Sequence, residues 1–133
     1  MPTPARPILV VEDDPDLLAL MEMILSDVGY RVRTAAEGGA ALDRVAEEMP
    51  ALVLLDMRMP GMNGWDFARE FRRRHGRSSP IVVVTAAEDA RARAEEIGAD
   101  GWLAKPFDLD EVIAAVARHA GEPARHGFPA SPR

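Results

Sequence analysis

The stretch Ile8-Leu9-Val10-Val11-Glu12-Asp13-Asp14-Pro15 decides the architecture of this chain. Four consecutive apolar residues are typical of a β-strand that is covered on both faces. The run ends at acidic residues, and Pro15 then opens a helix at a position where its missing N–H costs nothing. Asp14 stands where a helix N-cap is expected. A buried strand that leads directly into a capped helix indicates the first half of a βαβ unit.

The alternation of short apolar runs with helical periods continues to about residue 120. Further strands are expected at residues 30–35, 52–55, 81–84 and 102–104. Helices are expected at residues 15–28, 40–49, 65–74 and 90–97, and from Asp108 onward with Leu109, Val112, Ile113 and Val116 on the inward face. The first of these further strands alternates apolar residues with arginines, which indicates a strand at the edge of the sheet.

Strands and helices that alternate through short loops form parallel sheets with right-handed crossovers. We therefore predict an α/β fold of the flavodoxin-like type, a doubly wound five-stranded parallel sheet in the order 2-1-3-4-5 with five helices. The domain is expected to span residues 8–121. A flexible N-terminus at residues 1–7 and a disordered tail at residues 122–133, which has three prolines and no period, are expected to flank it.

Composition narrows the classes of protein that this chain can belong to. With 133 residues, 47% of them hydrophobic, one domain with its own core is expected. The chain has no cysteine, which excludes disulfide scaffolds, thiolate metal sites and a cysteine nucleophile. A formal net charge of −6 opposes nucleic acid and anionic membranes as partners. No membrane span or signal peptide is evident, so a cytoplasmic location is expected.

One group of residues is positively charged, although the chain as a whole is negative. Basic residues gather around the end of the third predicted helix, at Arg69, Arg72, Arg73, Arg74 and Arg77. Such a cluster could touch nucleic acid, but the helix dipole also favours cations at a C-terminus. We prefer the second interpretation and do not expect nucleic acid as a partner.

Polar residues end four of the predicted strands. Glu12 and Asp13 follow the first run, Asp56 the third, Thr85 the fourth and Lys105 the fifth. Because the carboxyl ends of parallel strands meet at one edge of a sheet, these side chains are expected to converge there. A purely structural interpretation, with acids as helix caps and a solvated lysine, explains each residue singly but not all of them together.

The combination favours phosphoryl transfer. Three carboxylates repel one another unless a hard cation neutralises them, and oxygen ligands without histidine or cysteine favour Mg²⁺. A carboxylate beside Mg²⁺ can itself attack phosphorus. The Thr85 hydroxyl and the Lys105 ammonium would then stabilise the other phosphoryl oxygens.

From Ile8 to Ala120 the chain resembles the receiver domain of two-component response regulators. The matching motifs are the opening stretch quoted above, Leu54-Leu55-Asp56-Met57-Arg58-Met59-Pro60-Gly61-Met62-Asn63-Gly64, Val84-Thr85-Ala86 and Gly98-Ala99-Asp100-Gly101-Trp102-Leu103-Ala104-Lys105-Pro106-Phe107. The resemblance implies that Asp56 is the phosphoacceptor, that Asp13 binds Mg²⁺ directly and that Glu12 does so mainly through water. It also implies a backbone carbonyl ligand from Arg58.

The resemblance carries further implications. A cis peptide is implied before Pro106, and a conformational switch is implied at Ala86 and Trp102. Tryptophan stands at residue 102 where the family usually has tyrosine or phenylalanine. The spacing from Thr85 to Lys105 is 20 positions, about two fewer than is usual, which places a deletion in the loop or helix after Thr85.

The expected function is that of a stand-alone receiver. It would accept a phosphoryl group on Asp56 from a sensor histidine kinase or a histidine phosphotransfer protein and then bind an output protein, as a monomer or a phosphorylation-dependent dimer. Transfer and autodephosphorylation would be self-catalysed, so it is not expected to be a dedicated enzyme. A Mg²⁺-dependent phosphatase would need a second carboxylate two residues after the nucleophile, where Arg58 stands. A receiver-like interaction module without phosphorylation remains the alternative.

Overall fold

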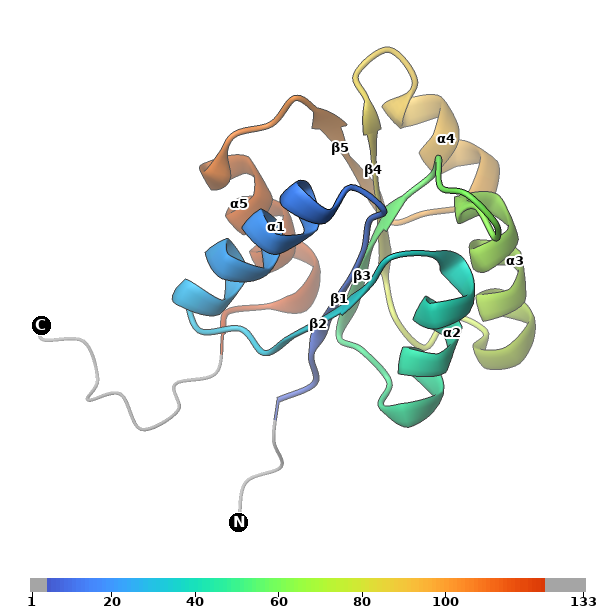
Figure 1. The fold of residues 1–133 in the computed structure, drawn as a ribbon, viewed down its shortest axis with the longest axis horizontal. Coiled ribbons are helices and arrows are strands. Elements are labelled where there is room, and N and C mark those ends of the chain that lie inside the picture. Colours follow the sequence, from blue (N-terminus) through green and yellow to red (C-terminus); the bar gives the residue numbers. More distant parts are fainter. Residues whose placement is uncertain (1–4, 124–133) are drawn as a thin grey trace, which may run out of the picture.

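The computed structural model describes residues 5–123, and the predictions for residues 1–4 and 124–133 lie outside that range. Five strands and five helices alternate along the chain (Figure 1). The strands are β1 (Ile8–Val11), β2 (Val32–Ala35), β3 (Leu52–Asp56), β4 (Ile81–Ala86) and β5 (Gly101–Lys105). The helices are α1 (Pro15–Asp27), α2 (Gly38–Glu47), α3 (Gly64–His75), α4 (Ala90–Ile97) and α5 (Leu109–Ala120).

The strands form one parallel sheet in the order β2-β1-β3-β4-β5, which confirms the predicted flavodoxin-like architecture. β2 lies at one edge, as its alternating sequence indicated, and only its last residue is fully buried. The central strands β1 and β3 are buried at every position. Their unbroken apolar runs are therefore explained by helices that cover both faces.

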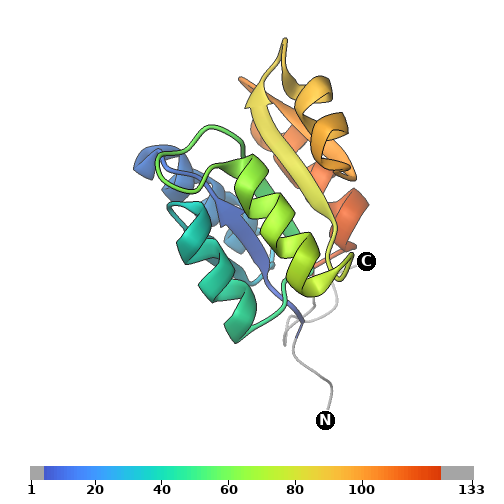
Figure 2. The ribbon, with the colours of Figure 1, turned by 90° about the vertical axis from the view of Figure 1, so that its right-hand side faces the viewer.

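Two apolar layers flank the sheet because successive residues of each strand face opposite sides. Leu9, Val53 and Val83 pack with α2, α3 and α4, while Ile8, Leu54 and Val82 pack with α1 and α5. Figure 1 shows α1 and α5 on one side of the sheet and the other helices on the opposite side. Figure 2 shows α2 and α3 side by side in front of it. This packing fixes the strand ends relative to one another.

The helix starts follow from capping residues. Asp14 accepts hydrogen bonds from the backbone N–H groups of Asp16 and Leu17 at 3.0 and 3.4 Å, and Pro15 occupies the first helical position. At α5, Asp108 and Glu111 form a reciprocal capping box. Both starts agree with the sequence pattern. No helix within residues 5–123 combines the length and the apolar character that a bilayer span requires.

One prediction about the core is wrong. Leu109 was expected on the inward face of α5, but its side chain is 50% exposed. Leu109 is the first residue of the helix and lies before the turn that packs on the sheet, whereas Val112 and Val116 are fully buried. The helical period placed the later residues correctly and failed at the end of the helix.

Candidate functional site

The predicted polar residues lie at the carboxyl ends of adjacent strands. Glu12 and Asp13 follow β1, Asp56 ends β3, and Thr85 and Lys105 lie at the ends of β4 and β5. In the register, Asp56 pairs with Val84, the residue before Thr85, and Lys105 pairs with Ala86. The parallel topology therefore brings all of these positions to one edge of the sheet, at the upper ends of the strands in Figure 1.

Three carboxylates form a cluster at this edge. Glu12, Asp13 and Asp56 each offer one oxygen, and these oxygens all lie within 4.8 Å of one another. Glu12 is 1% exposed and Asp56 is 5% exposed, whereas Asp13 is open to solvent. Two buried anions at this distance repel each other strongly because little water screens them.

Lys105 compensates only part of this charge. Its Nζ lies 3.1 Å from Glu12 Oε1 and 3.9 Å from Asp56 Oδ1. Within residues 5–123, the buried Oε1 of Glu12 has no hydrogen-bond partner, so the 3.1 Å contact is an ion pair without hydrogen-bond geometry. The other oxygen, Oε2, accepts the backbone N–H of Asp14 at 3.1 Å.

The donor set fits a hard divalent cation. Every side chain of the cluster offers oxygen, one oxygen is buried without a hydrogen-bond partner, and the negative charge exceeds that of Lys105. Mg²⁺ binds such sites through one or two carboxylates and keeps several waters. The carboxylate cluster present here matches the chemistry of this ion.

Asp56 has a strongly shifted pKa. Burial, followed by repulsion from Glu12, raises the pKa of Asp56 to about 7, although Lys105 opposes the shift. The backbone N–H of Arg58 donates to Asp56 Oδ1 at 3.2 Å and also favours the ionised form. The carboxyl group is therefore partly protonated near neutral pH until further positive charge arrives. A positive ion would restore the carboxylate, the form that can act as a nucleophile.

The residues expected to switch lie next to this site. Thr85 is 3% exposed, Ala86 is half-buried, and the Trp102 side chain is 49% exposed. Trp102 thus occupies an outward position, as the switch hypothesis requires of the unmodified protein, but its movement stays a prediction. The Lys105-Pro106 peptide bond is cis, as the resemblance implied.

An apolar groove beside Lys105 was not predicted from the sequence. It has a volume of about 440 Å³, and its walls include Leu17, Leu20, Phe107 and Leu109. Leu20 is 39% exposed, so two leucines face solvent next to the acidic cluster. The signal in the sequence that could have indicated this groove was Leu109. An apolar residue directly after a helix cap has no preceding turn of its own helix to cover it.

The side chain of Arg58 makes contacts that the sequence also did not reveal. Its guanidinium lies 3.9 Å from an oxygen of Asp89 in the loop before α4 and 5.9 Å from the centre of the Trp65 ring. Arg93 of α4 lies over the same ring at 5.7 Å. These residues are up to 35 positions apart in sequence, and no local pattern connects them. Arg58 therefore links the loop after Asp56 to α3 and α4.

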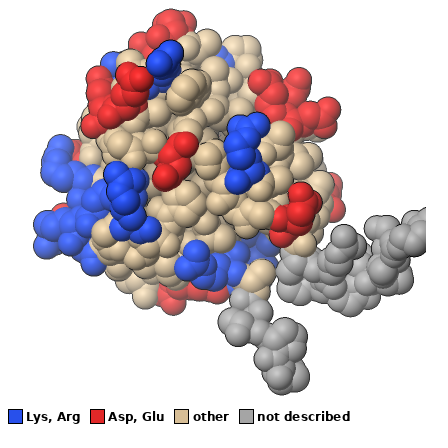
Figure 3. All heavy atoms as spheres, turned by 180° about the vertical axis from the view of Figure 1, so that it is seen from behind, with Lys and Arg blue, Asp and Glu red and all other residues tan. Residues whose placement is uncertain are grey.

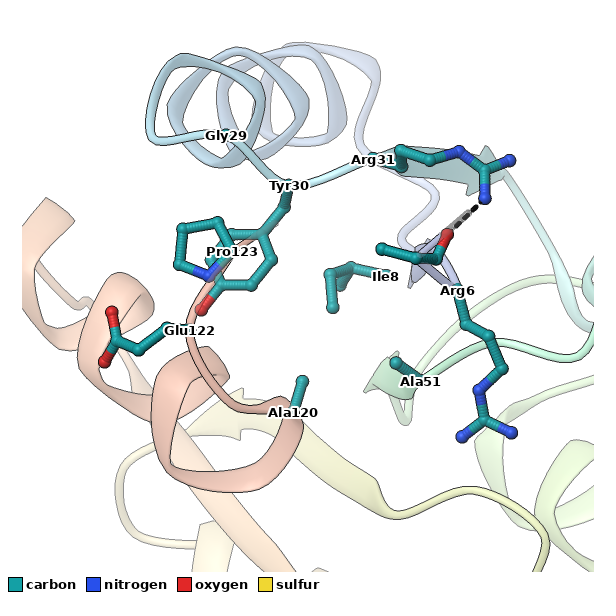
Figure 4. Close-up of a pocket in the computed structure, with 10 residues that line it drawn as sticks. Arg6, Ile8, Gly29, Tyr30, Arg31, Ala51, Ala120, Glu122 and Pro123 are labelled. Atoms are coloured by element: carbon teal, nitrogen blue, oxygen red, sulfur yellow. Dashed lines mark hydrogen bonds between the residues drawn. The ribbon is translucent and has the colours of Figure 1, made fainter. Parts of the chain in front are cut away.

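A second cavity lies at the amino ends of the strands, opposite the acidic cluster, and has a volume of about 240 Å³ (Figure 4). Ile8, Tyr30 and Ala120 contribute to its wall. Arg31 donates to the backbone carbonyl of Ala5 and to Glu48, and the Tyr30 hydroxyl donates to Gly121 at 2.6 Å. The Arg31 and Tyr30 side chains at this cavity are therefore engaged in structural hydrogen bonds.

Comparison with known proteins agrees with the geometry. The family model described as the response regulator receiver domain matches residues 8–117. Among solved structures, chemotaxis protein CheY4 of Vibrio cholerae is 28% identical with a TM-score of 0.79, covering 87% of this chain and 99% of its own. The receiver domain of NtrX from Brucella abortus is 32% identical with a TM-score of 0.78, covering 85% and 97%. A CheY-like receiver domain protein from Methanospirillum hungatei is 26% identical with a TM-score of 0.77, covering 86% and 93%.

Proposed function

Because the chain belongs to the response regulator receiver family, we propose that Asp56 accepts a phosphoryl group from a phosphohistidine in a Mg²⁺-dependent reaction and that this changes the binding of an output protein. The observation that carries the proposal is the buried carboxyl of Asp56, which lies within 4.8 Å of two further carboxylates and 3.9 Å from Lys105. A nucleophile, a cation site and a fixed positive charge thus meet at one edge of the sheet.

The residues divide the work of phosphoryl transfer. A carboxylate oxygen of Asp56 forms a bond to phosphorus while the bond from phosphorus to the donor histidine nitrogen breaks, and the electron pair of that bond stays on the imidazole. Glu12, Asp13, Asp56 and the carbonyl of Arg58 would hold Mg²⁺, which neutralises charge on the phosphoryl oxygens when bound. Lys105 and the Thr85 hydroxyl stabilise the remaining charge after transfer.

The same residue set argues for a switch rather than a dedicated enzyme. Arg58 stands two residues after the nucleophile, where a hydrolase of this chemistry would need a second carboxylate as acid and base. The acyl phosphate on Asp56 would therefore persist longer than a turnover intermediate and would be lost by autodephosphorylation. Two-component phosphorelays of this type operate in the cytoplasm, where we place the protein.

The apolar groove beside Lys105 supports docking of the phosphoryl donor. A histidine kinase or histidine phosphotransfer protein must bring its phosphohistidine to Asp56, and the groove formed by Leu17, Leu20, Phe107 and Leu109 borders the Lys105 side of the site. Exposed leucines beside a polar site are typical of a surface that receives an apolar helix face. The groove thus gives the donor a place to bind next to the nucleophile.

The proposal is tested by intact mass after incubation with acetyl phosphate. We expect an adduct of about 80 Da that forms only with Mg²⁺ and is absent in Asp56→Asn. Asp110→Asn, an exposed α5 carboxylate outside the cluster, serves as the control and should still form the adduct. If the wild-type protein forms no adduct with either acetyl phosphate or a phosphorylated histidine donor, an interaction module without phosphorylation is the better description.

A further inference from the structure

A groove between α3 and α4 lies outside the site described above. Its volume is about 270 Å³, and it is lined by Trp65, Ala68, Arg69, Arg72, Glu96 and Ile97. Apolar side chains from both helices thus combine with two arginines of α3. This mixture suits a ligand that carries both an apolar group and negative charge.

Three of the arginines of this region are paired with carboxylates. Arg73 and Arg74 both bind Glu70, and Arg69 lies 3.2 Å from Asp66. These pairs are formed within α3 and lie on its exposed side. Because Arg73 and Arg74 share one carboxylate, these pairs reduce the positive charge of the predicted basic cluster without cancelling it.

Arg72 and Arg77 differ from their neighbours. Arg72 donates to the Gly98 carbonyl at 3.2 Å and lies 4.0 Å from Asp100, but its buried Nη1 has no hydrogen-bond partner within residues 5–123. In the same described range, Arg77 forms no ion pair and is exposed. Its Nη2 lies 3.4 Å from the position that a Cβ on Gly98 would take, so both guanidinium groups approach the same loop.

Arg72 and Arg77 carry two positive charges, and Asp100 is the carboxylate near them. Burial, and then the charge of Arg77, lower the pKa of Arg72, while Asp100 opposes the shift. The Oδ2 atom of Asp100 already accepts the backbone N–H of Ile81 at 2.9 Å. Lys and Arg side chains gather on the left of Figure 3, over the side where Figure 1 places α3 and α4. The end of the groove near Gly98 therefore carries positive charge that no carboxylate fully balances.

The acidic residue of the groove does not supply the missing charge. Glu96 accepts the Trp65 indole N–H at 2.8 Å through Oε1 and a guanidinium N–H of Arg93 at 2.9 Å through Oε2. Both of its oxygens are thus engaged away from Arg72. These bonds also fix the indole of Trp65 as one wall of the groove.

We propose that this groove binds an acidic segment of a partner protein, with carboxylates at Arg72 and Arg77 and an apolar side chain against Trp65 and Ile97. Charge complementarity identifies the occupant, since the accessible part of the Arg72 guanidinium and the exposed guanidinium of Arg77 suit carboxylates. Nucleic acid suits the surface less well because the outward arginines, which a phosphate backbone would contact, are paired with acids.

The test uses Trp65 as a reporter. The chain has two tryptophans, so Trp102→Phe leaves Trp65 as the only indole. We would follow its emission during titration with a capped peptide of about twelve residues built from glutamate, leucine and glycine. The expected dissociation constant is below about 1 mM. Replacing the glutamates of the peptide by glutamine should weaken binding at least about fivefold.

Variants of the protein locate the contact. Arg72→Gln and Arg77→Gln should each weaken binding of the glutamate peptide at least about fivefold. Arg91 is an exposed arginine of α4 outside the groove, and Arg91→Gln should leave binding unchanged. Arg77 is exposed, so its variant keeps the test valid if Arg72→Gln does not fold. No binding, equal affinity for the glutamine peptide, an equal loss in Arg91→Gln, or tighter binding of a DNA duplex would each overturn the proposal.

Discussion

At the scale of single residues, Asp56 is held between opposing charges. Its pKa of about 7 lies above the usual value of 3.8, so folding favours the protonated form. This contribution to stability is fully present below about pH 4 and is lost as the pH rises through 7. In metal-free buffer, Asp56→Asn should therefore raise the free energy of unfolding by about 1 kcal/mol or more at pH 8 and by less at pH 5.

Urea unfolding in EDTA at the two pH values measures this difference. The comparison of variant with wild type cancels the titration of groups remote from Asp56. Asp110→Asn, outside the cluster, gives the matched control and should show no such pH dependence. An Asp56→Asn gain of equal size at pH 5 and pH 8 would contradict the pKa assignment.

Asp13 tests the cation site at the same scale. Mg²⁺ at one hundred times its dissociation constant should stabilise the wild-type protein by about 2.7 kcal/mol. Asp13→Asn should remove most of this response because it takes one carboxylate from the cluster. Asp14→Asn should keep it, since Asp14 caps α1 and asparagine caps helices equally well. Thermal melting with and without Mg²⁺ distinguishes the two variants, and a loss in both would argue against the assignment of Asp13.

At the scale of the elements, sequence reasoning succeeded where the signal was local. The apolar run before Glu12 and the cap at Asp14 predicted β1 and the start of α1, and the parallel topology then brought Asp56 and Lys105 to one edge. Packing between elements was not predictable. The exposure of Leu109 depends on where α5 meets α1, which no residue period encodes.

The α3–α4 groove was missed for the same kind of reason. The basic cluster around Arg72 was visible in the sequence, but its state of pairing was not. Glu70 pairs with two of the arginines through contacts within α3, whereas the surroundings of Arg72 and Arg77 depend on Gly98 and Asp100 in the loop after α4. Charges can be counted from a sequence, but their partners depend on how the helices cross.

The apolar groove between α1 and α5 gives a prediction about elements. Leu20→Ser and Leu109→Ser should slow phosphoryl transfer from a histidine phosphotransfer protein at least about tenfold, because each removes apolar surface from the groove. Neither should alter the rate with acetyl phosphate, which needs no docking surface. Met23→Ser is the matched control, since Met23 is 55% exposed on α1 but lies outside the groove. Equal slowing with both donors would show damage to the site itself.

At the scale of the whole molecule, the proposed phosphorylation can shift the fold only through contacts that differ between two states. Trp102 is the residue placed to report this, because its half-exposed ring can turn inward if the Thr85 hydroxyl moves toward the phosphoryl group. In Trp65→Phe, Trp102 is the only indole. We expect its emission to shift to shorter wavelength and acrylamide quenching to fall by about half or more on phosphorylation.

Two controls accompany this measurement. Asp56→Asn in the same background should show no change with Mg²⁺ and acetyl phosphate, and intact mass should confirm the adduct on the responsive protein. A confirmed adduct with unchanged emission and quenching would eliminate the Trp102 switch. The loop after Thr85 would then be the better candidate for transmitting the signal.

The position of Arg58 has a thermodynamic consequence for the molecule as a whole. Its backbone N–H holds Asp56, while its side chain touches Trp65, a wall of the α3–α4 groove. If a ligand in that groove changes the affinity of the acidic cluster for Mg²⁺ by some factor, Mg²⁺ must change the affinity for that ligand by the same factor. The two equilibria are then linked without any direct contact between their ligands, and either ligand can serve as the input while the other is measured as the output.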